Sequence, residues 1–198
     1  MKIQDLSKDI ILAKKAALKS GKFLLNEKDK INKRLNSDSK DVKLMADIES
    51  ENLIKSVISS ESKYPILAEE SGKSSEDLGE IYWVIDPLDG TANYSRDIPI
   101  CCVSIGLVKE MKPMLGVIYD FNNNQMYSGD IFSNSANMND VPINVSQKSH
   151  KKESILITGL PYKTDYSNSS LDNMIQDMQQ WQKIRMIGSA AMAACYIA

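Results

Sequence analysis

The feature that most constrains this chain is the stretch 81–93, which reads IYWVIDPLDGTAN. A run of apolar and aromatic residues passes directly into two carboxylates, Asp86 and Asp89, and then into Gly90. A buried strand that ends in paired acids and a turn brings charge to the edge of a core, where the charge needs a compensating partner. A bound cation is the obvious partner, so the stretch predicts a metal site.

The bulk properties are those of an ordinary globular protein. The 198 residues are 42% hydrophobic and 25% charged, with a net charge of −2. That charge gives no general attraction to nucleic acid or to an anionic membrane, and no apolar run reaches the roughly 20 residues of a spanning helix. We therefore expect no nucleic-acid or membrane partner. With reduced cysteines and no signal-peptide pattern at the start, a cytoplasmic location is expected.

Periodicity predicts helices and strands in a mixed order. An amphipathic helix is expected over 3–30, and a second helix is expected from Asp47, as its N-cap, to about Ser60. Short strands are expected at 66–68 and 81–85, followed by a hairpin over 101–119. Further strands are expected at 125–128, 143–145, 155–158 and 184–187, with helices at 170–182 and 189–198. This order predicts an α+β fold of mixed layers.

Four acids stand at the ends of these predicted elements: Asp47, Glu69, Asp86 and Asp89. Ligands that are all oxygen select hard cations, so Mg²⁺ is the expected metal and Mn²⁺ a possible substitute. The only histidine lies in a polar stretch, which argues against a His-ligated zinc site. Each acidic motif alone also fits an ordinary turn or a solvated pair. The evidence lies in their combination.

The turn also offers an anion site. Backbone N–H groups of Gly90 and Thr91 would lie at a helix start, where phosphate is favoured. Metal ions and N–H donors that converge on one point suit phosphate-ester hydrolysis, because charge develops on the phosphoryl oxygens. The sequence therefore favours a phosphatase.

Several motifs in this order carry a family likeness. They are AEES at 68–71, WVIDPLDGTANY at 83–94, VSIG at 103–106, LGVIY at 115–119, PINVS at 142–146, TGLP at 158–161, and R-x-x-GSAA at 185–191. The combination resembles the inositol monophosphatase family of Mg²⁺-dependent, lithium-sensitive phosphatases. The likeness covers nearly the whole chain. It implies the layered α-β-α-β sandwich of the inositol monophosphatase and fructose-1,6-bisphosphatase-like fold, with Li⁺ as an inhibitor.

The resemblance also implies roles for particular residues. Metal ligands would be Glu69, Asp86, Asp89 and the carbonyl of Leu88. The attacking water would be held and activated by Asp47 and Thr91, with Glu69 also in the catalytic set, and it would attack in line without a covalent intermediate.

Substrate contacts are implied as well. Phosphate would be bound by Gly90 and Thr91, and the alcohol portion by Gly188, Ser189 and Ala190. Lys43 has two open readings, facing the phosphate or standing as a solvated loop charge.

The predicted function is hydrolysis of inositol monophosphate or a similar small polyol or sugar phosphate, in a homodimer. Alternative substrates are a 3′(2′),5′-bisphosphate nucleotide and histidinol phosphate. The family continues to another aspartate ligand, whereas this chain ends at Ala198 in an uncapped apolar helix. We therefore expect a metal- and phosphate-binding region over 1–145 and an incomplete region over 146–198. A truncated, non-catalytic homologue that acts as a binding or interaction domain is the alternative of another class.

Overall fold

The computed structural model describes residues 5–35, 43–133, 135–160 and 164–198, with helices and strands in the mixed order expected. The helices are α1 (Ser7–Asn26), α2 (Lys28–Ile31), α3 (Met45–Glu61), α4 (Thr91–Tyr94), α5 (Asn168–Met178) and α6 (Ala190–Ile197), with a 3₁₀ turn at Lys151–Glu153. The strands are β1 (Ile66–Ala68), β2 (Gly72–Lys73), β3 (Ile81–Asp89), β4 (Cys102–Lys109), β5 (Lys112–Asp120), β6 (Gln125–Asp130), β7 (Ser135–Met138), β8 (Val141–Ile143), β9 (Ile155–Thr158) and β10 (Lys183–Met186).

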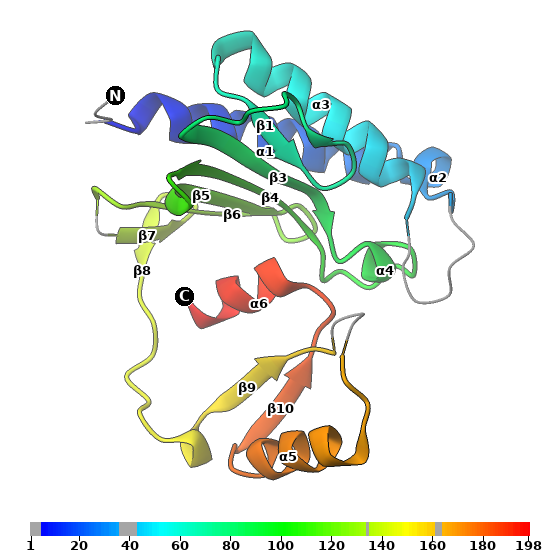
Figure 1. Ribbon diagram of the computed structural model, residues 1–198, viewed down its shortest axis with the longest axis vertical. Helices are drawn as coiled ribbons and strands as arrows, with labels where there is room; N and C mark the ends of the chain where they lie inside the picture. The colour runs from blue at the N-terminus through cyan, green and yellow to red at the C-terminus, as the bar shows by residue number, and fades with distance from the viewer. Residues whose placement is uncertain (1–4, 36–42, 134, 161–163) are drawn as a thin grey trace.

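The elements stack in layers (Figure 1). The main sheet has the order β2-β1-β3-β4-β5-β6-β7-β8, and all its neighbours pair antiparallel except β1 and β3, which run parallel. Helices α1 and α3 cover one face of this sheet, and α6 lies against the other. Beyond α6 come the parallel pair β9 and β10, and then α5. The predicted layered α+β fold is confirmed.

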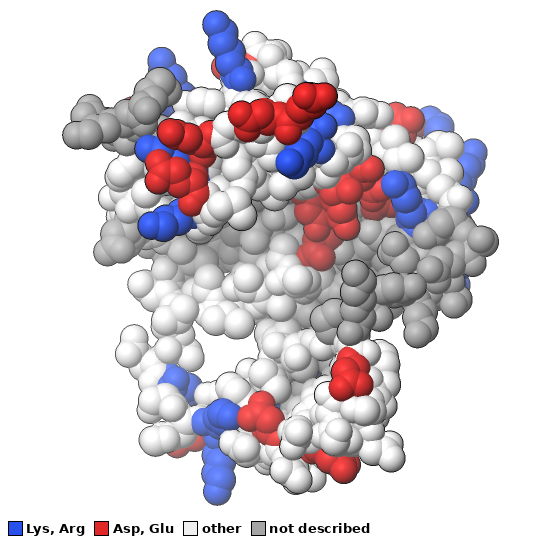
Figure 2. Space-filling view, viewed as in Figure 1, with Lys and Arg blue, Asp and Glu red and all other residues white. Residues whose placement is uncertain are grey.

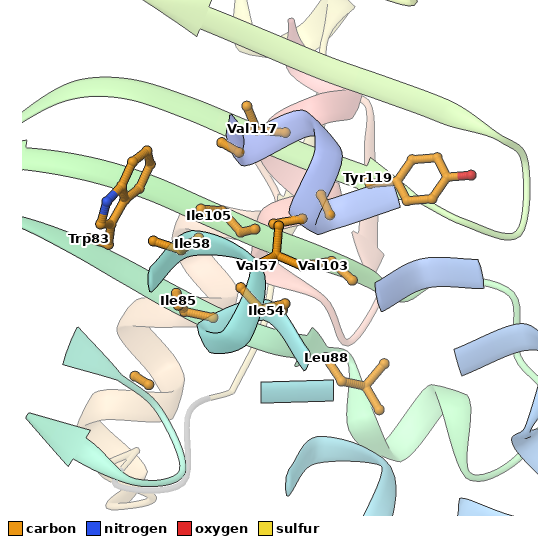
Figure 3. Packing of buried hydrophobic residues seen from close by; sticks show 14 of the residues in the cluster. Ile54, Val57, Ile58, Trp83, Ile85, Leu88, Val103, Ile105, Val117 and Tyr119 are labelled. Atoms are coloured by element: carbon orange, nitrogen blue, oxygen red, sulfur yellow. The ribbon is translucent and has the colours of Figure 1, made fainter. Parts of the chain in front are cut away.

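The core lies between the main sheet and its two covering helices. Apolar residues at helical spacing on α3 pack onto alternate residues of β3, including Trp83 and Ile85 (Figure 3). Trp83 is fully buried, and its indole N–H donates to the hydroxyl of Ser62 at 3.0 Å. The alternation on β3 therefore fixes the strand against α3 up to the point where its acids begin.

Some sequence predictions need correction. The polar stretch 133–140 contains strand β7, which was not predicted. Its exposed and half-buried side chains lack the apolar alternation that marks a strand. The helix predicted over 3–30 is two helices, α1 and α2, that meet at Glu27. The predicted division at residue 145 falls between β8 and β9, and it stays a prediction.

None of the described helices is long and apolar enough to cross a membrane. The three cysteines are all buried and free.

Close packing of α1 on the sheet generates a stability prediction. A Cβ added at Gly21 would lie 2.6 Å from the Tyr119 ring and 2.8 Å from the Cβ of Phe121. Alanine favours a helix by about 1 kcal/mol over glycine, but overpacking a core costs about 1–3 kcal/mol. We expect Gly21→Ala to lower the free energy of unfolding, measured by urea denaturation. The exposed neighbour substitution Lys22→Ala should change it by less than about 0.5 kcal/mol, and an equal effect of the two would contradict the prediction.

Candidate active site

The site begins where the parallel pairing of β1 with β3 ends. Ala68 pairs with Ile85, and the amide of Glu69 donates to the carbonyl of Ile85 at 3.1 Å. The next residues, Glu69 and Asp86, therefore place their carboxyl groups side by side. In the view that Figures 1 and 2 share, acidic side chains gather near the middle of the molecule (Figure 2), where Figure 1 places the end of β3.

This carboxyl pair is electrostatically unfavourable in the metal-free protein. Burial, followed by the charge of Glu69 and a hydrogen bond with it, raises the pKa of Asp86 to about 8. Asp89 adds further repulsion. A proton shared by two carboxyl groups holds the place of a cation, because either relieves the same repulsion. The pair fits a hard divalent cation.

Strand β3 runs through both acids to Asp89, beyond its predicted end at residue 85. Three local features shape the end of this strand and the turn that follows it. The amide of Leu88 donates to the carboxylate of Asp86 at 3.1 Å, and the pairing of β3 with β4 is irregular between Asp86 and Asp89. Gly90 has φ +88°, and a Cβ there would lie 2.7 Å from the carbonyl oxygen of Ile100. Glycine is therefore required at this position, both for its left-handed conformation and for space.

One face of α3 contacts two turns that carry acidic residues. We call the turn after β1 and the turn at the end of β3 the acid-bearing turns. The carboxylate of Asp47 accepts from the hydroxyl of Thr91 at 2.9 Å. One turn later the hydroxyl of Ser50 donates to the carbonyl of Pro87 at 2.9 Å, and Glu51 accepts from the amide of Glu70 at 2.8 Å. All three side chains of α3 are buried. The helix therefore fixes the turn after β1 and the turn after β3 relative to each other.

The sequence did not identify Ser50 and Glu51. One signal in the sequence could have identified them. The helical spacing of Ile54, Val57 and Ile58 continues toward the N-terminus through these two polar positions to Asp47. Asp47 also needs correction, because it lies inside α3 rather than at its N-cap. Its carboxylate accepts from the amide of Leu44, the true N-cap, at 2.6 Å.

Asp47 is the second carboxyl group with an altered proton affinity. Burial raises its pKa to about 6, although hydrogen bonds from the Leu44 amide and the Thr91 hydroxyl act in the opposite direction. A carboxyl group in this range can take up or release a proton near neutral pH. The Thr91 hydroxyl lies between Asp47 and the carbonyl of Leu88, 3.0 Å away.

The carboxylate of Asp89 faces the start of α6. It accepts from the hydroxyl of Ser189 at 2.6 Å and from the amides of Ala191 at 2.7 Å and Ala190 at 3.3 Å. The structure thus brings the predicted segment 188–190 to the turn across about 100 residues of sequence. No group of three or more His, Cys, Asp or Glu side chains in the described ranges is arranged to hold a metal ion. Of the predicted ligands, Glu69 and Asp86 face each other while Asp89 is held by α6.

Lys43 forms an ion pair with Glu70, beside Glu69, and the hydrogen bond to Glu70 raises the pKa of its ammonium group. Lys43 is therefore not merely a solvated loop charge, and its contact with phosphate stays a prediction. The predicted phosphate-binding pair, Gly90 and Thr91, lies at the start of α4, directly after the acids of β3.

Known proteins resemble this chain over nearly its whole length. The sequence profile of the inositol monophosphatase family matches residues 5–198. The chain belongs to this family. Its members are phosphomonoesterases, and a likeness of this extent includes both acid-bearing turns and the start of α6.

Individual relatives support the same assignment. The chain is 30% identical to the Nus factor SuhB of Pasteurella multocida over 94% of its own length and 71% of that protein. It is 38% identical to the inositol monophosphatase of Mesembryanthemum crystallinum over 59% of its length and 43% of that protein. The structure of inositol monophosphatase from Anabaena has a TM-score of 0.80 at 32% identity, covering 97% of this chain and 71% of that one. This family member therefore spans only part of the length of its relatives.

The buried contact between Glu51 and Glu70 generates a prediction. Glu51→Ala removes the acceptor and leaves the Glu70 amide without its partner, which costs about 1–3 kcal/mol of the free energy of unfolding. Urea denaturation measures the change. Glu51→Gln keeps an acceptor oxygen and should cost less. The exposed Glu49→Ala on the same helix is the control, and equal losses for Glu49→Ala and Glu51→Ala would refute the structural role.

The raised pKa of Asp86 generates a prediction for the metal-free protein in a chelator. Between about pH 4 and pH 8 the folded state keeps a proton that the unfolded chain, with a pKa near 3.8, has released. Stability therefore falls as the pH rises through this window. Asp86→Asn should flatten this dependence, so that relative to the unaltered chain it gains roughly 1 kcal/mol for each pH unit between pH 5 and pH 8.

Asp47 contributes a smaller slope of the same sign, which Asp86→Asn leaves in place. The exposed Asp172→Asn on α5 is the control and should keep the full pH dependence. If Asp86→Asn also keeps it, the carboxyl pair is not ionised as described.

Proposed function

We propose that this chain is a Mg²⁺-dependent phosphomonoesterase that hydrolyses inositol monophosphate or a similar small polyol or sugar phosphate. The observation that carries the proposal is the hydrogen bond from Thr91 to the buried carboxylate of Asp47, made beside the Glu69 and Asp86 pair. A hydroxyl that donates its proton to a carboxylate keeps its oxygen lone pairs available, so it can accept a hydrogen bond from a water molecule. That arrangement suits a residue that orients water for attack on phosphorus.

The metal would be held by Glu69, Asp86, Asp89 and the carbonyl of Leu88. These donors are all oxygen, which favours Mg²⁺ and accepts Mn²⁺. When bound, such an ion supplies charge neutralisation for the phosphoryl oxygens and a lower pKa for a coordinated water. Inhibition by Li⁺ belongs to the same proposal.

The protein's own part is to receive a proton and to orient the substrate. As a water attacks, Thr91 would relay its proton toward Asp47, whose pKa of about 6 allows it to hold that proton transiently. Glu69, whose charge acts on Asp47, would assist. The phosphate would be bound by the amides of Gly90 and Thr91, and the alcohol portion by Gly188, Ser189 and Ala190.

Direct attack by water is favoured over a covalent thiol intermediate. The thiol of Cys102 lies 3.9 Å from the carboxylate of Asp89, but burial raises its pKa far above the normal range. Burial likewise raises the pKa of Cys101 to about 11. Neutral thiols are poor nucleophiles.

The relatives extend beyond this chain, so the activity of the complete protein, its cytoplasmic location and its homodimeric state are part of the proposal. Bisphosphate nucleotides and histidinol phosphate are the alternative substrates. A second candidate is a non-catalytic binding domain. One observation favours it: the name Nus factor carried by a relative.

Phosphate release from the purified chain tests the proposal. We expect release from inositol monophosphate that requires Mg²⁺, stops with a chelator and falls with Li⁺. The same assay with a bisphosphate nucleotide, histidinol phosphate and sugar phosphates orders the substrates. No Mg²⁺-dependent release from any of them would favour the binding domain.

Thr91→Ala separates water orientation from substrate binding. The variant loses the hydroxyl but keeps the backbone amide, so kcat should fall about 10²-fold or more with little change in KM. The exposed Ser169→Ala on α5 is the matched loss of a hydroxyl and should leave both constants unchanged. An unchanged kcat for Thr91→Ala would remove Thr91 from the proton path.

A further inference from the structure

Asn93 connects the turn after β3 to the segment that leads into α6. Its side-chain amide donates to the carbonyl of Ile100 at 2.7 Å and to the carbonyl of Ile187 at 2.7 Å. Ile187 is 94 residues away in sequence and directly precedes Gly188. One side-chain NH₂ group therefore fixes two distant loops at the site. Asn93 is not among the residues proposed above to bind the metal, the phosphate or the alcohol portion.

The packing around Gly188 makes this connection rigid. Gly188 has φ +72°, and a Cβ there would lie 3.1 Å from the amide nitrogen of Asn93 and 3.2 Å from its oxygen. The chain thus reverses directly against the Asn93 side chain, in a conformation that suits glycine. Ser189 directly follows Gly188, so the position of the Asn93 side chain determines the position of the first residues of α6.

The start of α6 in turn fixes the carboxylate of Asp89. The amide of Met192 donates to the Ser189 hydroxyl at 3.2 Å, so the acceptor side of this hydroxyl is used. Its single proton is then directed to Asp89, 2.6 Å away, and the amide of Ala191 donates to the same carboxylate oxygen. Hydrogen bonds from O–H and N–H donors favour an ionised, oriented carboxylate.

From these contacts we infer that Asn93 is a positioning residue for the metal ligand Asp89, and that it acts through the start of α6. The inference rests on the proposed function, because it takes Asp89 as a ligand of the divalent cation. Residues that orient metal ligands typically change metal affinity 10- to 100-fold when they are replaced. The role of Asn93 is therefore measurable in metal binding without any substrate.

The test is titration of the metal-free 198-residue chain with Mn²⁺, in which calorimetry measures the binding. Asn93→Ala removes both donated hydrogen bonds, and we expect its Kd for Mn²⁺ to rise at least tenfold. Asn137→Ala on β7 is the matched control and should bind as the unaltered chain does. Thermal unfolding of each variant identifies loss of fold. A folded Asn93→Ala variant that binds within twofold of the unaltered chain would overturn the inference.

Two variants at Ser189 cover the case in which Asn93→Ala does not fold. Ser189→Ala removes the hydroxyl donor and should weaken Mn²⁺ binding, whereas Ser189→Thr keeps a hydroxyl and should restore it. Equal binding by the alanine and threonine variants would contradict the path through Ser189.

Combining the substitutions tests the path itself. If Asn93 acts through the start of α6, the double variant Asn93→Ala with Ser189→Ala binds Mn²⁺ no more weakly than the weaker single variant. Fold-changes that multiply would show independent actions and refute the inference. An unaltered chain that binds no Mn²⁺ would refute it too. A chain that shows these Mn²⁺ effects but releases no phosphate would refute only the proposed function.

Discussion

The parallel pairing of β1 with β3 is the constraint on which the site depends. Parallel strands point the same way, so the residues that follow their last paired positions must share one place. Here those residues are Glu69 and Asp86, and their repulsion is met by a raised pKa in the metal-free protein. Every other pair of neighbouring strands described in the main sheet is antiparallel. The single parallel pair in the main sheet therefore lies where the chemistry is concentrated.

Side chains of helix α3 hold the residues at the ends of these paired strands in fixed positions. Its inward face is polar in its first two turns and apolar afterwards, so one element both orients the turns and anchors itself in the core. Asp47, Ser50 and Glu51 each contact a different part of the two turns. Burial gives these few hydrogen bonds their importance, because a buried polar group that loses its partner is costly.

Much of the fold and part of the site could be predicted from the sequence, and the boundary between success and failure has physical causes. Strands β1 and β9 have the predicted bounds, because short apolar runs between polar segments mark strands well. Strand β7 was missed because its side chains are exposed or only half-buried. The paired acids at the end of β3 were recognised by their local arrangement.

Contacts between distant residues carry no such local pattern. The bonds of Asp89 to Ser189 and of Asn93 to Ile187 span about 100 residues, and nothing near either end predicts the partner. Likewise, nothing in the sequence around Glu51 predicts its partner, the Glu70 amide. The sequence could propose which residue types form the site, but only the tertiary structure could show which of them hold the others.

The long span between Asp89 and α6 has a consequence for synthesis. The main sheet is complete in sequence at β8, about 50 residues before Ser189 leaves the ribosome. Contacts at such separation form late, because a long loop must close before they contribute. A nascent chain can therefore hold a folded sheet with Glu69 and Asp86 already opposed, before the side chain of Asp89 gains its partners on α6. The hydrogen bonds that orient the Asp89 carboxylate therefore form only once α6 docks on the sheet.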